Sequence, residues 1–436
     1  MIEMPGTGEG IAPTRLIVLT SRYPYWPGEW FLDPELAILS HDPRFSIEIA
    51  PLIVEGIPRA IPSTLVVHSD FPILVEKANR SISARSKRVF RRFLALCPWI
   101  GRADGARSRE QRKHYLAVLG QVESIRAILR QMLLNDHRST ILYAYWLSRS
   151  AMAAALLKKE RPELCLVART HGGDLYEARS PYGFFPLRRA ALRYFDLIAP
   201  VSCDGLAWLA QIYPEAKLEV HRLGTPDLKP SAFKPKADTI TLLSVSSAIL
   251  LKRIDRIIDA LVLIPPDFPY LIEWTHIGAG PELERLRESA RSRLCDRVSF
   301  SFTGELPNLE IHRLIAGGEI DIFINSSESE GIPVSIMEAM SGGIPVIAPA
   351  VGGIAEIVRD RINGRLLSAA CLPAEIAEAI CEPLWYRSSE PRIAARATWE
   401  SGYSAIRNYQ LWADVLAEVA AHIGENTRSM NKEASA

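Results

Sequence analysis

The chain has 436 residues, of which 48% are apolar, and its 51 Lys and Arg nearly balance its 50 Asp and Glu, so the net charge is +1. This length predicts two or three domains, and the apolar and aromatic content excludes an intrinsically disordered chain. The near-neutral charge argues against a general nucleic-acid-binding protein, which carries net positive charge to meet phosphates.

Cysteine spacing and hydropathy indicate the compartment. The six cysteines lie at least ten positions apart, so the sequence has no Cys-x-x-Cys pair typical of a zinc or redox centre. No apolar stretch reaches the ~18 residues of a membrane span, and the first apolar run, Leu16–Leu19, is too short for a signal peptide. We therefore expect a cytoplasmic protein with reduced thiols, either soluble or peripheral on the inner face of the membrane.

Short β-rich apolar runs alternate with helical patterns along the chain. In the first half they predict strands at Leu16–Leu19, Ser46–Ile53, Ile141–Ala144, Leu164–Val167, Leu197–Ala199 and Leu218–Val220. In the second half they predict strands at Ile240–Val245, Tyr270–His276, Val298–Phe300, Ile320–Ile324 and Pro345–Ala348, with helices at Ile254–Ile264 and Pro281–Ala290. Strands separated by helices predict parallel sheets built from βαβ units.

A proline-rich stretch without periodicity, Gly224–Pro235, is the best linker candidate. We therefore predict a first domain at 1–224, a linker at 225–238, a second domain at 239–398 and a C-terminal segment at 399–436. Within that segment, Trp399–Ile423 reads as one helix that returns to the first domain. The α/β pattern predicts two doubly wound, Rossmann-like domains facing each other across a cleft, with the carboxyl ends of their strands near the ligand.

The segment 77–113 departs from the neutral average. It contains twelve Lys and Arg against Asp104 and Glu110, a charge of +10, so the rest of the chain carries −9. Apolar residues such as Phe90 and Trp99 interleave with the basic ones, and this amphipathic pattern suits an anionic membrane surface, where each basic side chain contributes ~1 kcal/mol. The alternative is a solvated helix face whose apolar side lies in the core.

The stretch Asn325–Met340 follows a predicted strand, and its Pro333 stands where a helix would begin. The backbone N–H groups of Gly331, Ile332 and Val334 would then form an anion site at the helix N-terminus. Two carboxylates flank this site: Glu330 lies just before the helix, and Glu338 about two turns later. A ligand in which a diphosphate joins two sugar rings would use all of these groups. The alternative is that Glu330 is a capping acid and Glu338 a surface residue.

The spacing of Glu330 and Glu338 resembles the Glu-x7-Glu motif of the retaining family 4 glycosyltransferases, of the kind found in bacterial exopolysaccharide or lipopolysaccharide assembly. Further stretches resemble that family in the expected order: Val245–Asp255, Gly278–Leu283, Phe302–Leu306, Glu338–Ala348, Gly352–Val358, Asn363-Gly364 and Thr398–Glu400. In the first half, Arg169–Leu175 and Ala199–Gly205 resemble it less closely. The glycine-rich loop usual near the family's N-terminus is replaced here by Arg22–Trp30.

The resemblance implies a GT-B fold in which the second domain holds most of the nucleotide sugar and the first domain is the acceptor side. It implies that Glu330 contacts the donor sugar, Glu338 the ribose, and Gly331 and Ile332 the phosphates. Lys252 would neutralise the leaving diphosphate, and backbone groups near Gly304 and Leu306 would contact the base. His171 would lie near the donor sugar and the acceptor; its alternative is a structural imidazole at a strand end.

One cation of the family pattern is missing. Where an arginine usually precedes the lysine, this sequence has Ser246-Ser247, so Ser247 takes that place among the donor-binding candidates. Arg253, where glycine is common, is our candidate for supplying the charge. We expect neither a metal nor a cofactor, because fixed cations and helix-end amides can stabilise the departing diphosphate. The family precedent is attack on the same face, with the leaving phosphate helping to accept the acceptor's proton.

The sequence thus predicts a retaining, metal-independent glycosyltransferase of the hexosyltransferase type, which moves a sugar from a nucleotide-sugar donor to a glycan or a lipid-linked saccharide. The alternatives are a sugar-nucleotide epimerase of the same fold and a non-catalytic relative that binds nucleotide sugars. An NAD-dependent oxidoreductase is disfavoured, because Gly278-Ala279-Gly280 lacks the third glycine of the dinucleotide fingerprint.

Overall fold

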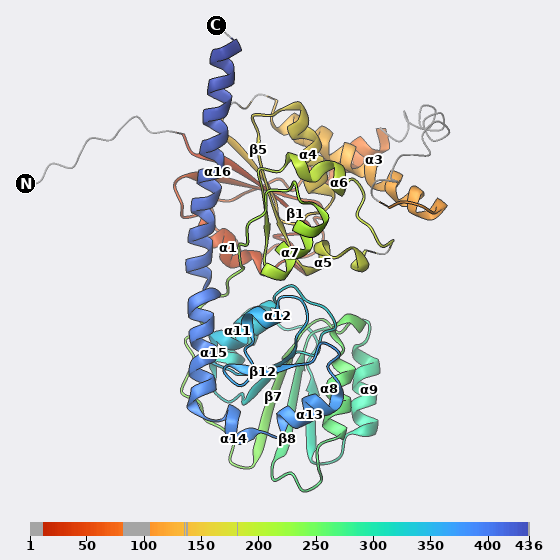
Figure 1. Ribbon diagram of the computed structural model, residues 1–436, viewed down its shortest axis with the longest axis vertical. Helices are drawn as coiled ribbons and strands as arrows, with labels where there is room; N and C mark the ends of the chain where they lie inside the picture. The colour runs from red at the N-terminus through yellow and green to blue at the C-terminus, as the bar shows by residue number, and fades with distance from the viewer. Residues whose placement is uncertain (1–11, 82–104, 135, 137, 181, 435–436) are drawn as a thin grey trace, which may run out of the picture. The chain divides into compact units, whose positions relative to one another are not determined.

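The computed structural model describes residues 12–81, 105–134, 136, 138–180 and 182–434, with side chains described as far as residue 423. The chain divides into two compact units (Figure 1). Unit 1 comprises residues 1–200, 208–219 and 410–436, and unit 2 comprises residues 201–207 and 220–409.

Unit 1 contains a parallel sheet that, in the described residues, has six strands in the order β3-β2-β1-β4-β5-β6. The strands are β1 (Thr14–Thr20), β2 (Phe45–Pro51), β3 (Val66–Val67), β4 (Thr140–Ala144), β5 (Cys165–Thr170) and β6 (Leu197–Pro200). The strand order reverses between β1 and β4, so the loops after these two strands run in opposite directions along the sheet. Such a topological switch point is where ligands of open α/β sheets bind.

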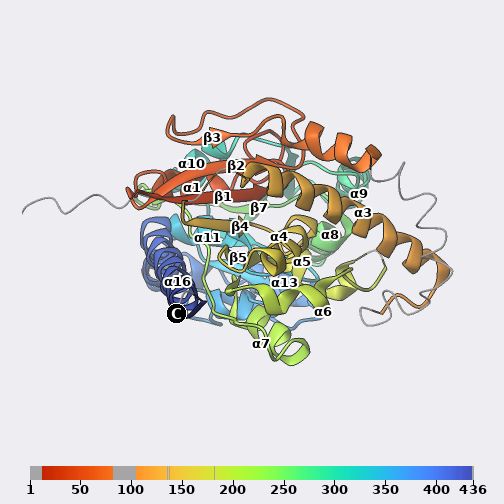
Figure 2. The same cartoon turned by 90° about the horizontal axis from the view of Figure 1, so that it is seen from above.

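Helices cover both faces of this sheet. One face carries α3 (Arg109–Met132) and α4 (Arg149–Glu160), which pack against each other, and the other carries α1 (Leu32–Leu39) and part of α16 (Ala405–Ala434) (Figures 1 and 2). The remaining helical segments of the first half are 71–81, α5 (Gly172–Leu175), Glu177–Arg179, α6 (Arg188–Ala191), Leu192–Tyr194 and α7 (Cys203–Ile212). Helix α3 begins with a capping box, because Ser108 Oγ accepts from Gln111 N and Gln111 Oε1 accepts from Ser108 N.

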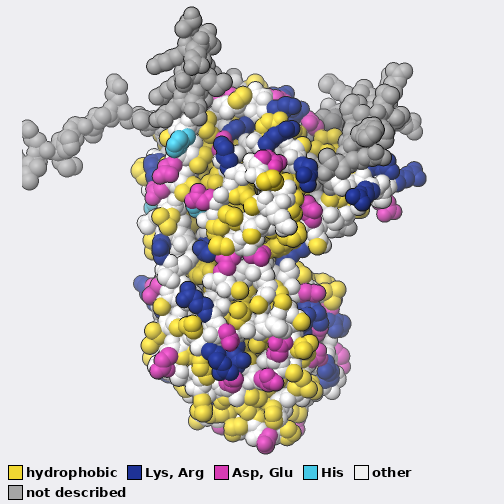
Figure 3. Space-filling view, viewed as in Figure 1, with side chains coloured by type: hydrophobic (Ala, Val, Ile, Leu, Met, Phe, Trp, Pro, Cys, Tyr) yellow, Lys and Arg dark blue, Asp and Glu magenta, His cyan; other side chains and the backbone are white. Residues whose placement is uncertain are grey.

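The basic segment 77–113 is described only in part, since residues 82–104 lie outside the described residues. Its described basic side chains are all exposed: Lys77, Arg80, Arg107, Arg109, Arg112 and Lys113. Figure 3 shows Lys and Arg side chains gathered at the upper right of unit 1. No helix among the described residues is long and apolar enough to cross a bilayer.

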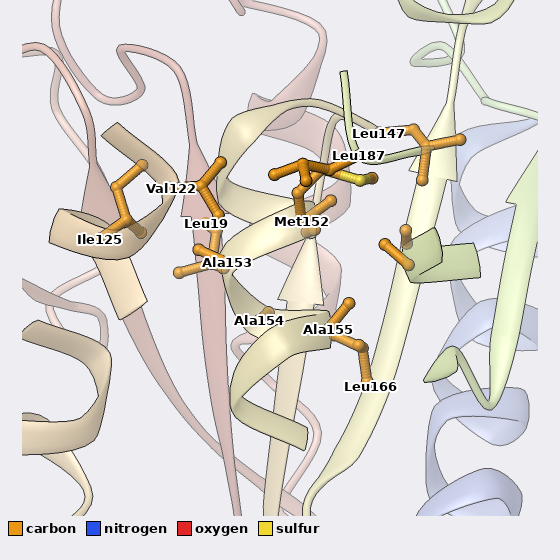
Figure 4. Packing of buried hydrophobic residues seen from close by; sticks show 14 of the residues in the cluster. Leu19, Val122, Ile125, Leu147, Met152, Ala153, Ala154, Ala155, Leu166 and Leu187 are labelled. Carbon is orange, nitrogen blue, oxygen red and sulfur yellow. The ribbon is translucent and has the colours of Figure 1, made fainter. Parts of the chain in front are cut away.

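The core between α4 and the sheet is built on small side chains. Ala153, Ala154 and Ala155 are fully buried in α4, beside buried Leu19 and Leu166 of the sheet (Figure 4). Alanine loses no side-chain entropy on burial and lets a helix approach its neighbours closely. The close packing of α4 holds the ends of β4 and β5, which carry the candidate site of this unit.

Unit 2 contains a second parallel sheet of six described strands, in the order β12-β11-β10-β7-β8-β9. They are β7 (Thr239–Val245), β8 (Leu271–Ile277), β9 (Val298–Phe302), β10 (Ile322–Ile324), β11 (Val346–Pro349) and β12 (Gly364–Leu367). The order reverses between β7 and β10, and this pair is the topological switch point of unit 2.

Helices again cover both faces. One face carries α8 (Ile254–Val262), α9 (Leu283–Arg293) and α13 (Pro373–Ile380), and the other carries α10 (Asn308–Ala316), α11 (Val334–Ser341) and α15 (Ser389–Gly402) (Figure 1). Short helical turns lie at Leu250–Lys252, α12 (Ile354–Ile357) and α14 (Pro383–Tyr386). These two units confirm the predicted pair of doubly wound domains.

Two of the predicted elements are wrong. Leu218–Val220 is no strand, because Leu218 makes only an isolated bridge with Ile198. The single helix predicted at Trp399–Ile423 is two helices, α15 and α16. The break arises because Thr225 is inserted between them: Thr225 N donates to Tyr403 O (2.9 Å), and Ala405 N donates to Thr225 O (3.0 Å). The short strands β3 and β12 were not predicted.

The predicted linker 225–238 contains neither helix nor strand. It is nevertheless bonded to unit 2, since Ser231 N donates to Ala316 O and Lys234 N donates to Gly318 O, both at 2.8 Å. The remaining domain boundaries and the cleft that we expected stay predictions.

Candidate functional site

The loops after β7 and β10 meet at the switch point of unit 2. Glu328 N donates to Leu251 O (2.9 Å), and Ser326 Oγ donates to Lys252 O (3.0 Å). These bonds tie the loop after β10 to the short helical turn after β7. Side chains that are distant in sequence are thereby held at fixed positions beside one another.

Two predicted catalytic residues meet there directly. Lys252 Nζ donates to Glu330 Oε1 at 2.5 Å, and the two side chains are only 21% and 9% exposed. A charge-assisted hydrogen bond of this kind is stronger than a neutral one, and partial burial strengthens it further. The site therefore presents one cation and one carboxylate that neutralise each other.

Arg253 occupies the next position, with a left-handed backbone (φ +47°) that favours glycine. Its guanidinium lies 3.1 Å from Asp255 Oδ2 and 3.9 Å from Glu328 Oε2. The hydrogen bond with Asp255 is the main cause that raises the pKa of Arg253, and the Glu328 charge adds to it. Carboxylates from the first turn of α8 and from the loop after β10 thus hold this cation at the site.

The loop that contains Ser247 lies tightly against the turn after β8. Ser247 itself is exposed, whereas a Cβ at Gly278 would lie 1.9 Å from Ser246 O and one at Gly280 2.3 Å from Ala248 O. Close backbone approach therefore explains the two glycines without a dinucleotide.

The turn after β9 joins the same edge. Gly304 O accepts from Gly278 N at 2.8 Å, and Gly304 has a left-handed backbone (φ +75°). Leu306 is half-buried and packs against the core of unit 2. Ser247 and Gly304 thus lie at the carboxyl ends of β7 and β9, on either side of the turn after β8, while the Leu306 side chain is a packing residue.

The N-terminus of α11 has unused donors. Helix α11 begins at Val334, one residue after Pro333, and Ile336 N and Met337 N both donate to Pro333 O. Within the part of the chain that the structure describes, the backbone N–H groups of Gly331 and Ile332 donate to no acceptor. They lie directly after Glu330, so the predicted anion-binding amides and the Lys252–Glu330 pair belong to one site.

Glu338 is a buried residue, only 1% exposed, and the interpretation as a surface residue is wrong. Its Oε1 lies 2.7 Å from His312 Nε2 and accepts a longer bond from Asn308 Nδ2 at 3.4 Å. Both partners belong to α10 and were missed from sequence. Their i, i+4 spacing on one helix face is the signal that could have found them.

In unit 1, one buried carboxylate organises the loop that replaces the family's glycine-rich loop. Glu29, 5% exposed, accepts from the successive backbone N–H groups of Ser21 (3.0 Å), Arg22 and Tyr23 (2.6 Å). It also accepts from Trp146 Nε1, in the loop after β4. Glu29 thus joins the two loops at the switch point of unit 1, a role that the sequence did not reveal.

His171 follows β5 at the same edge and is only 8% exposed. Its ring centroid lies 4.6 Å from that of Trp146 and 4.9 Å from that of Tyr145. Among the described residues, neither ring nitrogen has a hydrogen-bond partner. Burial, together with the nearby Arg169 charge, lowers the pKa of His171 to about 3, so the imidazole is neutral at physiological pH.

Asp174 holds the backbone around His171. Its carboxylate accepts from His171 N, Leu147 N (2.6 Å) and Thr170 Oγ1 (3.1 Å). Burial raises the pKa of Asp174 to about 6 despite these bonds. The ends of β4 and β5 are therefore locked together, and the His171 ring is positioned by its own backbone.

A buried polar cluster lies beneath this site. Arg169 Nε donates to Tyr143 Oη (2.7 Å), which donates to Glu35 Oε1 (2.6 Å), and Arg169 and Glu35 are both fully buried. The ring of Trp412, from α16, lies 4.5 Å from the Arg169 guanidinium. Such cation–π contacts stabilise a buried charge.

Comparisons with known proteins show which family the second half of the chain resembles. Residues 227–396 match the family described as "Glycosyl transferases group 1". The chain is 29% identical over 249 residues to the amylovoran biosynthesis glycosyltransferase AmsK of Erwinia amylovora, a match that covers 52% of this chain and 57% of that protein. It is 27% identical over 212 residues to the colanic acid biosynthesis glycosyltransferase WcaL of Escherichia coli, with 45% of this chain and 50% of that protein covered.

Solved structures show the same fold. The Anabaena protein Alr3699/HepE, in complex with UDP and glucose, superposes with a TM-score of 0.62 at 18% identity, covering 92% of this chain and 99% of that one. The lipopolysaccharide outer core galactosyltransferase WaaB superposes with a TM-score of 0.64 at 13% identity, covering 93% and 99%. The predicted GT-B fold and the resemblance to glycosyltransferases of polysaccharide biosynthesis are confirmed. The chain spans about half the length of AmsK and of WcaL.

Proposed function

We propose that this chain is a glycosyltransferase that moves a sugar from a nucleotide-sugar donor to a saccharide acceptor. The Lys252–Glu330 pair at the switch point of unit 2, beside the unused amides of Gly331 and Ile332, carries the proposal. A nucleotide sugar offers a diphosphate to Lys252 and the amides, and hydroxyls to Glu330. Donor binding would therefore exchange one ion pair for several charge-assisted bonds. The UDP-glucose complex of Alr3699/HepE supports this class of donor.

The other donor contacts follow from the same geometry. Glu338, held by His312, would accept from the ribose hydroxyls, and Arg253 would share the diphosphate charge with Lys252. The turn at Gly304, which is bonded to the turn after β8, would contact the base through backbone groups. Each assignment uses a group that is already positioned before the donor binds, which reduces the entropy lost on binding.

The proposed mechanism is retaining and independent of metal. As the bond between the anomeric carbon and the diphosphate oxygen breaks, negative charge grows on the diphosphate, where Lys252, Arg253 and the amides at α11 stabilise it. The acceptor hydroxyl attacks the same face, and its proton passes to the leaving phosphate. The anomeric configuration of the product by NMR tests retention, since an inverted product contradicts it. Activity that is lost in EDTA and restored by a divalent cation would contradict metal independence.

A screen of donors tests the function. UDP-glucose, UDP-galactose, UDP-N-acetylglucosamine and GDP-mannose would each be tested for thermal stabilisation, since a ligand at about 100 times its Kd adds ~2.7 kcal/mol. We expect one of them to stabilise the parent, and Lys252→Ala to lose that effect. Stabilisation by none of them would count against the proposal. An isomerised donor formed without any acceptor would instead indicate the epimerase.

We also propose that the basic segment 77–113 binds the anionic inner face of a membrane. The exposed Arg109, Arg112 and Lys113 at the start of α3 support this. Changing all three to Glu should abolish co-sedimentation with phosphatidylglycerol vesicles, and added salt should weaken the binding of the parent. A matched control changes Arg285, Arg291 and Arg293 of α9 to Glu. Equal vesicle binding by the α3 variant and the parent would contradict the proposal.

A further inference from the structure

An aromatic cluster surrounds His171 at the switch point of unit 1. The Phe31 ring lies 5.9 Å from the rings of both Trp30 and Trp146, and Trp146 lies 4.6 Å from His171. Trp30, Phe31 and Trp146 are each half-buried, so none of the three residues is fully withdrawn from solvent. These rings come from the loops after β1 and β4, which leave the sheet at the place where a ligand is expected.

The orientation of Trp146 is set by a dedicated partner. Its indole N–H donates to Glu29, whose remaining acceptor positions are taken by the backbone N–H groups of Ser21, Arg22 and Tyr23. A buried carboxylate with four donors is fully engaged and does not itself bind a ligand. It instead fixes the indole plane beside His171 before any ligand arrives, and such preorganisation favours binding.

His171 provides the polar groups beside the Trp146 indole. Both of its ring nitrogens are buried without a hydrogen-bond partner among the described residues, and leaving such groups unpaired destabilises the free protein. A neutral imidazole carries one donor and one acceptor, and a sugar hydroxyl offers the complementary acceptor and donor. A pyranose also presents a face of C–H bonds that packs against a flat aromatic ring.

We propose that Trp146, positioned by Glu29, forms with His171 a saccharide-binding subsite of unit 1. The indole contacts the C–H face of a pyranose ring, and the imidazole binds one of its hydroxyls. This subsite rests on the proposed function. It identifies the acceptor as a sugar residue rather than a bare lipid alcohol, and Trp146 is then a specificity-determining residue.

Kinetics with a saccharide acceptor test this subsite. Trp146→Ala should raise the KM for a p-nitrophenyl glycoside acceptor about tenfold, which corresponds to about 1.4 kcal/mol, and raise the donor KM much less. Trp146→Phe, which keeps a ring but no N–H, should recover part of the loss. The matched control is Trp26→Ala, in the loop after β1, whose ring instead contacts Arg59. Equal acceptor KM values for Trp146→Ala and the parent would overturn the proposal.

Binding without a donor separates this inference from the proposed function. Saturation-transfer NMR with methyl glucoside, galactoside and mannoside should show binding of at least one glycoside to the parent and to Trp26→Ala, and its loss in Trp146→Ala. That result would stand even if no nucleotide sugar supported transfer. Binding of none of the three by the parent, or undiminished binding by a folded Trp146→Ala, would overturn the subsite while leaving donor binding in unit 2 intact.

Discussion

Lys252 Nζ lies 2.5 Å from Glu330 Oε1, although 78 positions separate the two residues in the chain. The contact arises because β7 and β10 are neighbours in the sheet, so the loops after them share one edge. Withdrawing a carboxylate and an ammonium from water costs free energy, which their mutual attraction offsets only where the geometry is good. We infer that this pair serves to bind an anionic sugar donor.

Removing either partner of this pair should reduce catalysis. Lys252→Ala and Glu330→Gln should each lower kcat/KM by about 10²–10³-fold, the usual effect of deleting one electrostatic contact to the transition state. Steady-state kinetics measures this loss. The control is Lys236→Ala, which removes an exposed lysine paired with Glu273 and should leave kcat/KM unchanged. Parent-like rates in both pair variants would exclude the proposed site.

Replacing Arg253 should affect donor binding and the melting temperature in different ways. Its left-handed backbone disfavours any side chain, so Arg253→Gly should leave the melting temperature unchanged or raise it. The same change should weaken donor binding, because a cation is lost beside Lys252. Calorimetry and donor titration measure the two effects. Arg361→Gly, at a second left-handed position (φ +56°), is the control that should leave donor binding intact. Unchanged donor affinity in Arg253→Gly would contradict the role of this arginine.

Glu29 should be important for folding. Glu29→Gln replaces one acceptor oxygen by an NH₂ group facing backbone N–H donors, and each donor left unpaired costs about 1–3 kcal/mol. We expect a loss of several kcal/mol in the free energy of unfolding by urea titration. Glu55→Gln, at an exposed carboxylate, serves as the control. A parent-like urea midpoint for Glu29→Gln would show that the loop does not depend on this carboxylate.

His171 and Asp174 should have opposite effects on acid stability. The pKa of His171 is lowered to about 3, so the unfolded chain takes up a proton first and stability falls as the pH drops below ~6.5. The pKa of Asp174 is raised to about 6, so its contribution is present in acid and is lost as the pH rises through 6. Between about pH 4 and 6 the two effects oppose each other.

Single variants should therefore separate these two effects. Asp174→Asn should lose unfolding free energy more steeply with acid than the parent, by up to about 1.4 kcal/mol per pH unit. His171→Gln should lose it less steeply. Urea titrations across this range measure both slopes. Parallel pH profiles for the parent and both variants would show that neither group changes its pKa on folding.

Local patterns predicted most of the strands and the donor motif. Strands such as β1, β7 and β8 are seven residues long and contain short apolar runs such as Leu16–Leu19, and the order of short motifs predicted the glycosyltransferase resemblance. Both signals lie in consecutive residues. The strands β3 and β12, of two and four residues, are too short for such a signal, and the break between α15 and α16 depends on Thr225, far away in sequence.

The sequence by itself therefore determined the fold class and most of the candidate site in unit 2, because those residues lie in contiguous motifs next to strands. Only the tertiary structure decided how their charges pair, that His312 holds Glu338, and that Glu29 fixes Trp146 beside His171. Those contacts join side chains from different loops and helices. Their geometry arises when parallel strands bring the ends of distant segments to one edge of a sheet, and no local pattern encodes that distance.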